Sequence, residues 1–140
     1  MQETDYRVLP NFASRIKGGM PLHIYGTGNQ TRTFCYITDA IVGFFLVVLK
    51  GIPGEAYNIG NPNPEISMVN LVKRIEKIAP SPISYELVEY PDSYPGDEPN
   101  RRAPDIRKAR LQLSFNPLVE LNDGLKRFLD WSSEFYTGQP

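Results

Sequence analysis

The sequence predicts a mixed domain of the α/β or α+β class, on three observations. Apolar residues at helical spacing alternate along the chain with short β-type runs, as in 22–25 and 83–87. The 140 residues suit one compact unit or a piece of a larger one, since a domain usually has about 100–200 residues. Prolines and glycines separate the segments, and no internal repeat or long linker is visible.

Five helices are expected, over 7–17, 40–49, 68–78, 104–113 and from about Asn122, where Leu125, Phe128, Leu129 and Phe135 form the apolar face. Asp39 and Ser67 are the expected N-caps of the second and third, because their oxygens can accept backbone N–H groups. The run 40–49 is apolar on every side. In a helix this pattern predicts burial against more than one neighbour, so we expect a core helix there.

Strands are expected at 22–25, 34–37, 56–59 and 83–87, with a turn at 26–29 and a long polar loop at 91–103. These strands are few and short, while the helix at 40–49 and the strand at 56–59 require a sheet to pack against. Part of this apolar surface is therefore expected to fit a partner, either another chain or a missing part of the same one.

The composition excludes several classes of function. With 15 Lys and Arg against 16 Asp and Glu, the chain is not a basic nucleic-acid binder. One Cys and one His supply neither a disulfide nor a multi-ligand metal site. The longest apolar stretch, 40–49, is short of the roughly 20 residues of a membrane span, and the polar, acidic start is unlike a signal peptide. We expect a cytoplasmic protein, in a reducing compartment.

The common catalytic motifs are missing from the sequence. The pair Gly26-Thr27-Gly28 is followed by Thr31 where a dinucleotide fingerprint has its third glycine, and no Tyr has a Lys four residues later. No P-loop, His-Glu-x-x-His or Gly-x-Ser-x-Gly occurs. His23 and Cys35 are expected to be structural residues. No catalytic or metal-ligating residue is predicted in this chain.

Arginines in two separate segments could bind an anion. Arg32 follows the glycine-rich turn, where Gln30, Thr31 and Thr33 offer neutral donors, and Arg102 lies in the proline-marked loop. Guanidinium groups bind phosphate oxygens through paired hydrogen bonds, so the two could clamp a diphosphate. The alternative, which composition alone favours, is a pair of solvated salt bridges, Arg32 with Asp39 and Arg102 with Asp105.

A longer motif contains the first of these arginines. Residues 21–39, PLHIYGTGNQTRTFCYITD, closely resemble the segment PLxxYGxGxQTRxFxYxxD of the extended short-chain dehydrogenase/reductases that act on nucleotide sugars. Among these, UDP-glucuronate decarboxylases and dTDP-glucose 4,6-dehydratases are the most similar. Residues 8–12, 57–61 (YNIGN) and 102–109 (RAPDIRKA) match further blocks of the family in the same order.

The resemblance implies that residues 1–140 are the C-terminal nucleotide-sugar-binding region of such an enzyme, with its N-terminal Rossmann domain absent. The fold would be α/β: a small mixed substrate domain plus elements, 40–49 and 56–59, that complete the Rossmann domain. NAD would bind the full-length enzyme and not this chain alone, which would be inactive. In a decarboxylase, NAD+ oxidises C4 of UDP-glucuronate, carbon dioxide leaves, and the hydride returns. We also expect the isolated chain to associate with itself through the vacated surface.

The resemblance also implies six binding residues and changes the preference between the two interpretations of the arginines. Arg32 matches the family's diphosphate-binding arginine, and Arg102 matches the late arginine that reaches the diphosphate or the sugar. Leu22 and Tyr25 match the strand flanking the nucleotide base, and Asn11 and Asn58 match positions close to the nucleotide. Thr33 stands where many relatives have Asp, so another group must orient Arg32.

Two other functions remain open from the sequence. One is a stand-alone nucleotide-sugar binding module without catalysis, and the other is a protein-interaction domain whose apolar helix docks a partner. The sequence leaves open UDP against dTDP, the sugar, and decarboxylase against dehydratase against epimerase chemistry.

Overall fold

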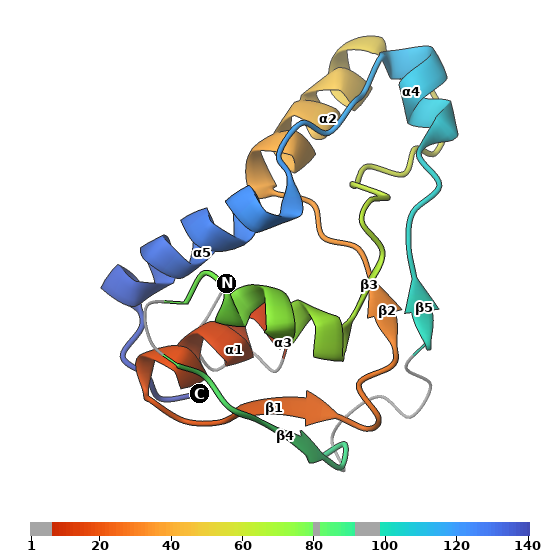
Figure 1. Cartoon of the computed structure of the whole chain (residues 1–140). Helices are drawn as coiled ribbons and strands as arrows, with labels where there is room; N and C mark the ends of the chain where they lie inside the picture. The colour runs from red at the N-terminus through yellow and green to blue at the C-terminus, as the bar shows by residue number, and fades with distance from the viewer. Residues whose placement is uncertain (1–6, 80–81, 92–98) are drawn as a thin grey trace.

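The computed structural model describes residues 7–79, 82–91 and 99–140, a mixed α/β arrangement as predicted (Figure 1). The helices are α1 (Val8–Lys17), α2 (Ile37–Lys50), α3 (Met68–Glu76), α4 (Arg107–Leu113) and α5 (Leu121–Phe135). The strands are β1 (Leu22–Tyr25), β2 (Thr31–Arg32), β3 (Ile66–Ser67), β4 (Tyr85–Val88) and β5 (Arg101–Arg102). All five expected helices are therefore present, with small shifts at their ends.

The strands form two small sheets. β1 pairs with β4 in parallel, beginning with Leu22 opposite Tyr85. In the second sheet β2 is central, antiparallel to β3 and parallel to β5. Parallel strands need a crossover connection, and here the chain passes through α2, β3, α3 and β4 between β2 and β5. The second sheet thus joins segments that are distant in sequence.

The larger core lies where α1, α3 and α5 pack around β1. Its buried members come from all four elements and from β3: Phe12, Leu22, Ile24, Ile66, Met68, Leu71, Val72, Ile75, Leu121 and Leu125. The hydroxyl of Ser67 accepts the backbone N–H of Asn70, which confirms Ser67 as the N-cap of α3. Burying a Leu or Phe side chain contributes about 1.5–3 kcal/mol, so this region contains most of the chain's apolar stabilisation.

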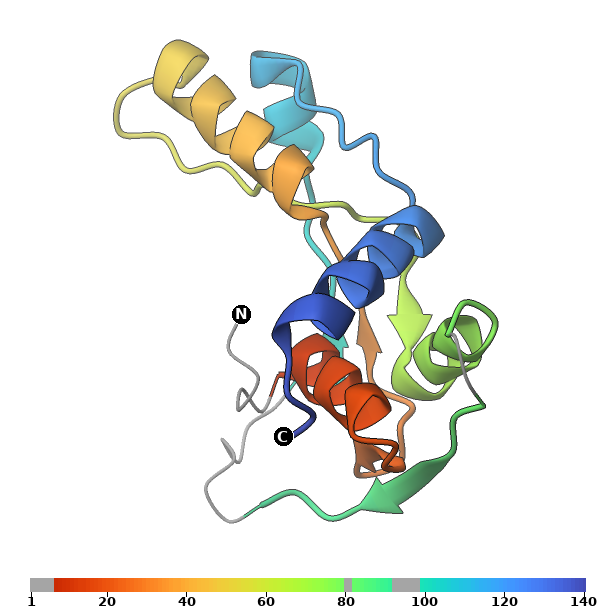
Figure 2. The ribbon, with the colours of Figure 1, turned by 90° about the vertical axis from the view of Figure 1, so that its left-hand side faces the viewer.

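A smaller core joins α2 and α4 at the opposite end of the molecule from β1 and β4 (Figure 2). Ile106, Ala109, Leu113 and Phe115 are buried there. Gly43 allows α2 to lie close to Ile59 and Phe115. A Cβ at this position would lie 2.3 Å from a methyl carbon of Ile59 and 3.0 Å from the Phe115 ring. The close approach is therefore specified by a single small residue.

The expectation of a core helix at 40–49 is wrong for this chain. In α2, Phe44, Phe45, Val48 and Leu49 are 62%, 63%, 79% and 76% exposed. Apart from Asp39 in its first turn, the helix buries the face that meets α4, and the described residues provide no second layer for the other face. Phe135, expected in the core from α5, is likewise 63% exposed.

The predicted N-cap role of Asp39 is also wrong. Tyr36 is the N-cap of α2, and Asp39 lies in the first turn. Its carboxylate instead accepts the backbone N–H groups of Leu118 and Val119 at 3.0 and 2.9 Å. This buried side chain therefore ties α2 to the segment that leads into α5.

Two of the four predicted strands are not formed. Residues 34–36 have no regular structure and Ile37 begins α2, because the ladders from β2 to its two neighbours end at Arg32. Residues 56–59 have no strand partner in the described chain, and Tyr57 and Ile59 pack against the smaller core. Of the predicted loop at 91–103, residues 92–98 lie outside the described part, and 101–102 form β5.

Among the helices that the structure describes, none combines the length and the apolar character needed to cross a membrane.

Candidate functional site

The sheet of β3, β2 and β5 brings the two predicted phosphate-binding arginines together. Arg32 of β2 and Arg102 of β5 are register partners in a parallel ladder. Adjacent strands lie about 4.8 Å apart, and residues directly opposite each other project on the same face. Two arginines from segments remote in sequence therefore start from neighbouring positions on one face of the sheet. Nη1 of Arg32 also donates to the carbonyl of Thr31 at 2.8 Å.

The aspartates of the salt-bridge alternative have other partners. The Asp105 carboxylate forms a two-point contact with Arg107, with the closest oxygen and nitrogen 2.6 Å apart. The hydrogen bonds from Arg107 lower the pKa of Asp105 to about 2. Asp39 binds the backbone amides that precede α5. Asp105 is thus held by a neighbour in sequence, and Asp39 by a segment that is remote in sequence.

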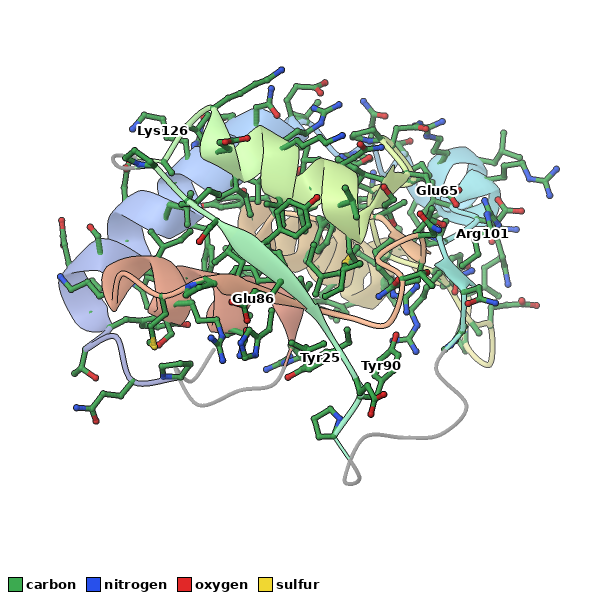
Figure 3. The ribbon with its side chains drawn as sticks, turned by 60° about the horizontal axis from the view of Figure 1, so that its bottom comes forward. Tyr25, Glu65, Glu86, Tyr90, Arg101 and Lys126 are labelled. Carbon is green, nitrogen blue, oxygen red and sulfur yellow. The ribbon has the colours of Figure 1, made fainter. Side chains whose placement is uncertain are left out.

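The residues that precede the two arginines both bind the carboxylate of Glu65. Thr31 and Arg101 immediately precede Arg32 and Arg102 and are themselves register partners. Glu65 accepts the hydroxyl of Thr31 and two donor groups of Arg101, at 2.8 to 3.0 Å for the arginine contacts. Figure 3 shows Glu65 and Arg101 side by side. Thr31, expected as a free donor for a ligand, is thus engaged inside the protein.

An aromatic pair lies at the end of the β1–β4 sheet. The rings of Tyr25 and Tyr90 stack with centroids 5.5 Å apart (Figure 3). The side-chain amide of Gln30 donates to the carbonyl of Tyr25 at 2.9 Å and contacts the Tyr90 hydroxyl at 3.4 Å. Gly26, at a φ of +65°, leaves room for the Tyr90 ring, since a Cβ there would lie 3.0 Å from it. Sequence analysis missed Tyr90, because its only signal is this tertiary pairing.

The other predicted binding residues have different surroundings. The Leu22 side chain is 0% exposed and belongs to the larger core, so it supports β1 from inside. Asn58 donates its amide to the Asp105 carbonyl at 3.0 Å. The side-chain oxygen of Asn11 is buried with no hydrogen-bond partner among the described residues, a condition that costs free energy in a folded protein. Of the three, Asn11 alone presents an unmet polar group.

His23 and Cys35 lie in structural settings. His23 is the register partner of Glu86, with 4.0 Å between the imidazole nitrogen and the carboxylate oxygen. Burial lowers the pKa of His23, with Arg15 adding to the effect, so the ring is neutral at pH 7. Burial and the nearby Asp39 charge raise the pKa of the Cys35 thiol. The raised pKa favours the protonated thiol, which is a poor nucleophile.

The glycine-rich turn before β2 does not have the setting of a dinucleotide fingerprint. A dinucleotide fingerprint needs a glycine turn that opens a helix, whereas the Gly26-Thr27-Gly28 turn leads into β2. Gly28 is buried, and a Cβ there would lie 2.6 and 2.9 Å from the side chains of Val69 and Ile24. This glycine therefore serves local packing. No cluster of metal-binding side chains occurs among the described residues either.

Comparison with known proteins shows which enzymes this chain is similar to. Residues 1–60 match the NAD dependent epimerase/dehydratase family. The chain is 34% identical over 131 residues to UDP-glucuronic acid decarboxylase 1 of Xenopus tropicalis, covering 94% of this chain and 30% of the relative. It is 35% identical over 130 residues to human dTDP-D-glucose 4,6-dehydratase, covering 91% of this chain and 37% of the relative.

The solved structures agree in fold. A crystal structure of UDP-glucuronic acid 4-epimerase from Bacillus cereus, in complex with UDP-glucuronic acid and NAD, superposes with a TM-score of 0.83 at 32% identity. The match covers 94% of this chain and 41% of the epimerase. The chain is thus similar in sequence and in fold to NAD-dependent epimerases and dehydratases, in agreement with the motif resemblance. It spans about a third of the length of these curated relatives.

Proposed function

We propose that this chain binds the diphosphate of a nucleotide sugar and acts as the C-terminal, substrate-binding part of an NAD-dependent decarboxylase, dehydratase or epimerase. The single observation that carries this proposal is the register pairing of Arg32 with Arg102 across β2 and β5. Each guanidinium can give two parallel hydrogen bonds to phosphate oxygens, so the pair matches the two phosphates of one ligand. UDP- and dTDP-linked sugars both offer this group.

The neighbouring residues suit the rest of such a ligand. Tyr25 and Tyr90 offer ring faces on which a pyrimidine base can stack. Asn11, whose side-chain oxygen is buried without a partner among the described residues, is proposed as a nucleotide contact from the motif resemblance. Asn58 and the core residue Leu22 hold the backbone around the site in place. The ligand would thus be fixed at several points, which is what orients a sugar for reaction.

The chemistry itself belongs outside this chain. The sequence contains neither the third glycine of a dinucleotide fingerprint after Gly26 and Gly28 nor a Tyr-x-x-x-Lys pair. We expect NAD to bind a Rossmann domain that covers the exposed face of α2, and we expect this chain alone to catalyse no reaction. What its residues do is bind the diphosphate, hold the sugar in a fixed orientation, and present it to that domain.

Calorimetric titration of this chain with UDP-glucose and dTDP-glucose tests the proposal. Losing a hydrogen bond to a charged group costs about 1.5–3 kcal/mol, so Arg32→Ala and Arg102→Ala should each weaken binding about tenfold or more. Arg110→Ala, at an exposed arginine of α4, is the matched control and should bind like the original chain. Equal affinity in the original chain and Arg32→Ala would refute the diphosphate assignment.

The apolar face of α2 favours a second candidate, a domain that docks another protein without binding a nucleotide. Phe44, Phe45, Val48 and Leu49 are all more than 60% exposed on one helix, and contiguous exposed apolar residues mark interaction surfaces. In this case neither nucleotide sugar produces heat in the titration, although the chain is folded by circular dichroism.

A further inference from the structure

Glu65 is an acid that the motif comparison did not single out, yet it has the densest set of polar contacts near the two arginines. Its carboxylate accepts the Thr31 hydroxyl. It also accepts Nε of Arg101 at 3.0 Å and Nη2 of Arg101 at 2.8 Å. One side chain, located just before β3, therefore connects β2 to β5.

The two residues that Glu65 binds lie directly next to the two arginines in the sheet. Thr31 and Arg101 are opposite each other, and the next residue of each strand is Arg32 or Arg102. Successive residues of a strand project to opposite faces. Glu65 thus holds one face of the β2–β5 pair, while the two arginines stand on the other face.

The backbone alone holds this pair weakly. β2 and β5 have two residues each, so few ladder bonds fix their relative position. One of them is the bond from the Thr31 N–H to the Asn100 carbonyl, at 2.8 Å. A slip of one residue would move Arg102 to the opposite face of the sheet. A side-chain contact across the strands therefore adds to the few bonds that fix the register.

The contact between Glu65 and Arg101 is of a kind that fixes the relative position of two strands. A carboxylate that accepts two parallel bonds from one guanidinium fixes both distance and orientation. The Thr31 and Arg101 hydrogen bonds hold the pKa of Glu65 below its ordinary value, so the carboxylate is charged at neutral pH. Exposed ion pairs add little to folding stability, and the Arg101 side chain is 69% exposed. The contact should therefore affect the register more than the stability of the fold.

We propose that Glu65 is a positioning residue for nucleotide-diphosphate binding: through Thr31 and Arg101 it keeps Arg102 beside Arg32 in the register that receives the two phosphates. The inference rests on the proposed function. It also predicts whether removing the Glu65 charge weakens or strengthens anion binding. Removing a negative charge near an anion site should strengthen anion binding through simple electrostatics, whereas loss of the register should weaken it.

The test is the affinity for UDP-glucose, whose diphosphate diester stays fully charged near neutral pH. Glu65→Gln should bind about three- to tenfold more weakly and unfold at the same temperature as the original chain. Arg101→Lys, which keeps the charge but loses the two-point contact, should weaken binding to a similar degree. Because both changes break one contact, the double variant should bind no more weakly than either single variant.

The matched control is Glu55→Gln, another exposed acid that pairs with a lysine, Lys108, away from the sheet. Its affinity should equal that of the original chain. Unchanged or tighter binding in Glu65→Gln, together with lost binding in Arg32→Ala, would overturn the inference and leave the proposed function standing. Unchanged binding in Arg32→Ala as well would overturn both. Fully additive losses in the double variant would also contradict a shared contact.

Discussion

The two ends of this molecule bury apolar residues to very different degrees. Around β1, helices α1, α3 and α5 enclose a core in which Phe12, Leu22 and Leu71 are at most 1% exposed. At the other end α2 and α4 share a small core, and the outer face of α2 is open, with Val48 79% exposed (Figures 1 and 2). The apolar side chains around β1 are enclosed by neighbouring helices. Those on the outer face of α2 are exposed.

This contrast shows how an apolar sequence can be misinterpreted. The run 40–49 has the composition of a buried helix, and it predicted burial correctly for the α4 side only. The apolar composition of a helix indicates that its side chains favour burial. Whether they are buried depends on neighbouring elements, and the described residues provide such a neighbour, α4, on one side only. The difference predicts that substitutions at the two ends will have unequal effects.

The largest effect is expected in the larger core. Phe12→Ala should lower the free energy of unfolding by about 3–5 kcal/mol, because it leaves a cavity among well-packed side chains. Phe45→Ala, at a 63% exposed position of α2, should change it by no more than about 0.5 kcal/mol. Urea unfolding followed by circular dichroism measures both. Comparable losses would show that the face of α2 is covered in solution.

An intermediate effect is expected where the two ends are tied together. Asp39→Ala leaves the N–H groups of Leu118 and Val119 without their acceptor, which should cost about 1–3 kcal/mol of stability. Asp130→Ala removes an exposed acid paired with Lys126 on α5 and should cost at most about 1 kcal/mol. If urea unfolding gives equal values for both variants, Asp39 does not join the two ends.

The smallest effect on stability, and the clearest on association, is expected for the outer face of α2. We expect the chain to self-associate at high micromolar concentration, because burial of apolar surface yields about 25 cal/mol per Å2. Val48→Lys with Leu49→Lys should shift sedimentation equilibrium toward monomer with little change in unfolding. Leu111→Lys, on α4 and 86% exposed, is the control. A monomer in the unsubstituted chain at that concentration would contradict the prediction.

Local chemistry made several elements predictable. Ser67 caps α3 because a hydroxyl at that position can reach the Asn70 amide without help from the rest of the fold. The run 22–25 forms β1 over the predicted residues. Asp39 also has the residue type of a cap, but its carboxylate found two amides of a distant segment, and no local rule anticipates this contact.

The candidate site shows the same division. The residue types and the motif indicated Arg32 and Arg102 as phosphate-binding groups, and their assignment as such remains a proposal. Their adjacency could not be predicted from the residues, since β5 lay within an expected loop and no strand was predicted at 31–32. Tyr90 and Glu65 escaped notice because a stacked ring and a bridging carboxylate have no signature in sequence spacing.

By itself, then, the sequence determined which segments become helices and which enzymes the chain resembles, and it indicated the two arginines that we propose as anion-binding groups. These properties follow from side-chain type and from spacing along a few turns or strands. Only the tertiary structure decided which face of α2 is covered, what Asp39 binds, and that Arg32 and Arg102 share one sheet. Each of these depends on a neighbour far away in the chain, and short-range periodicity contains no information about that neighbour.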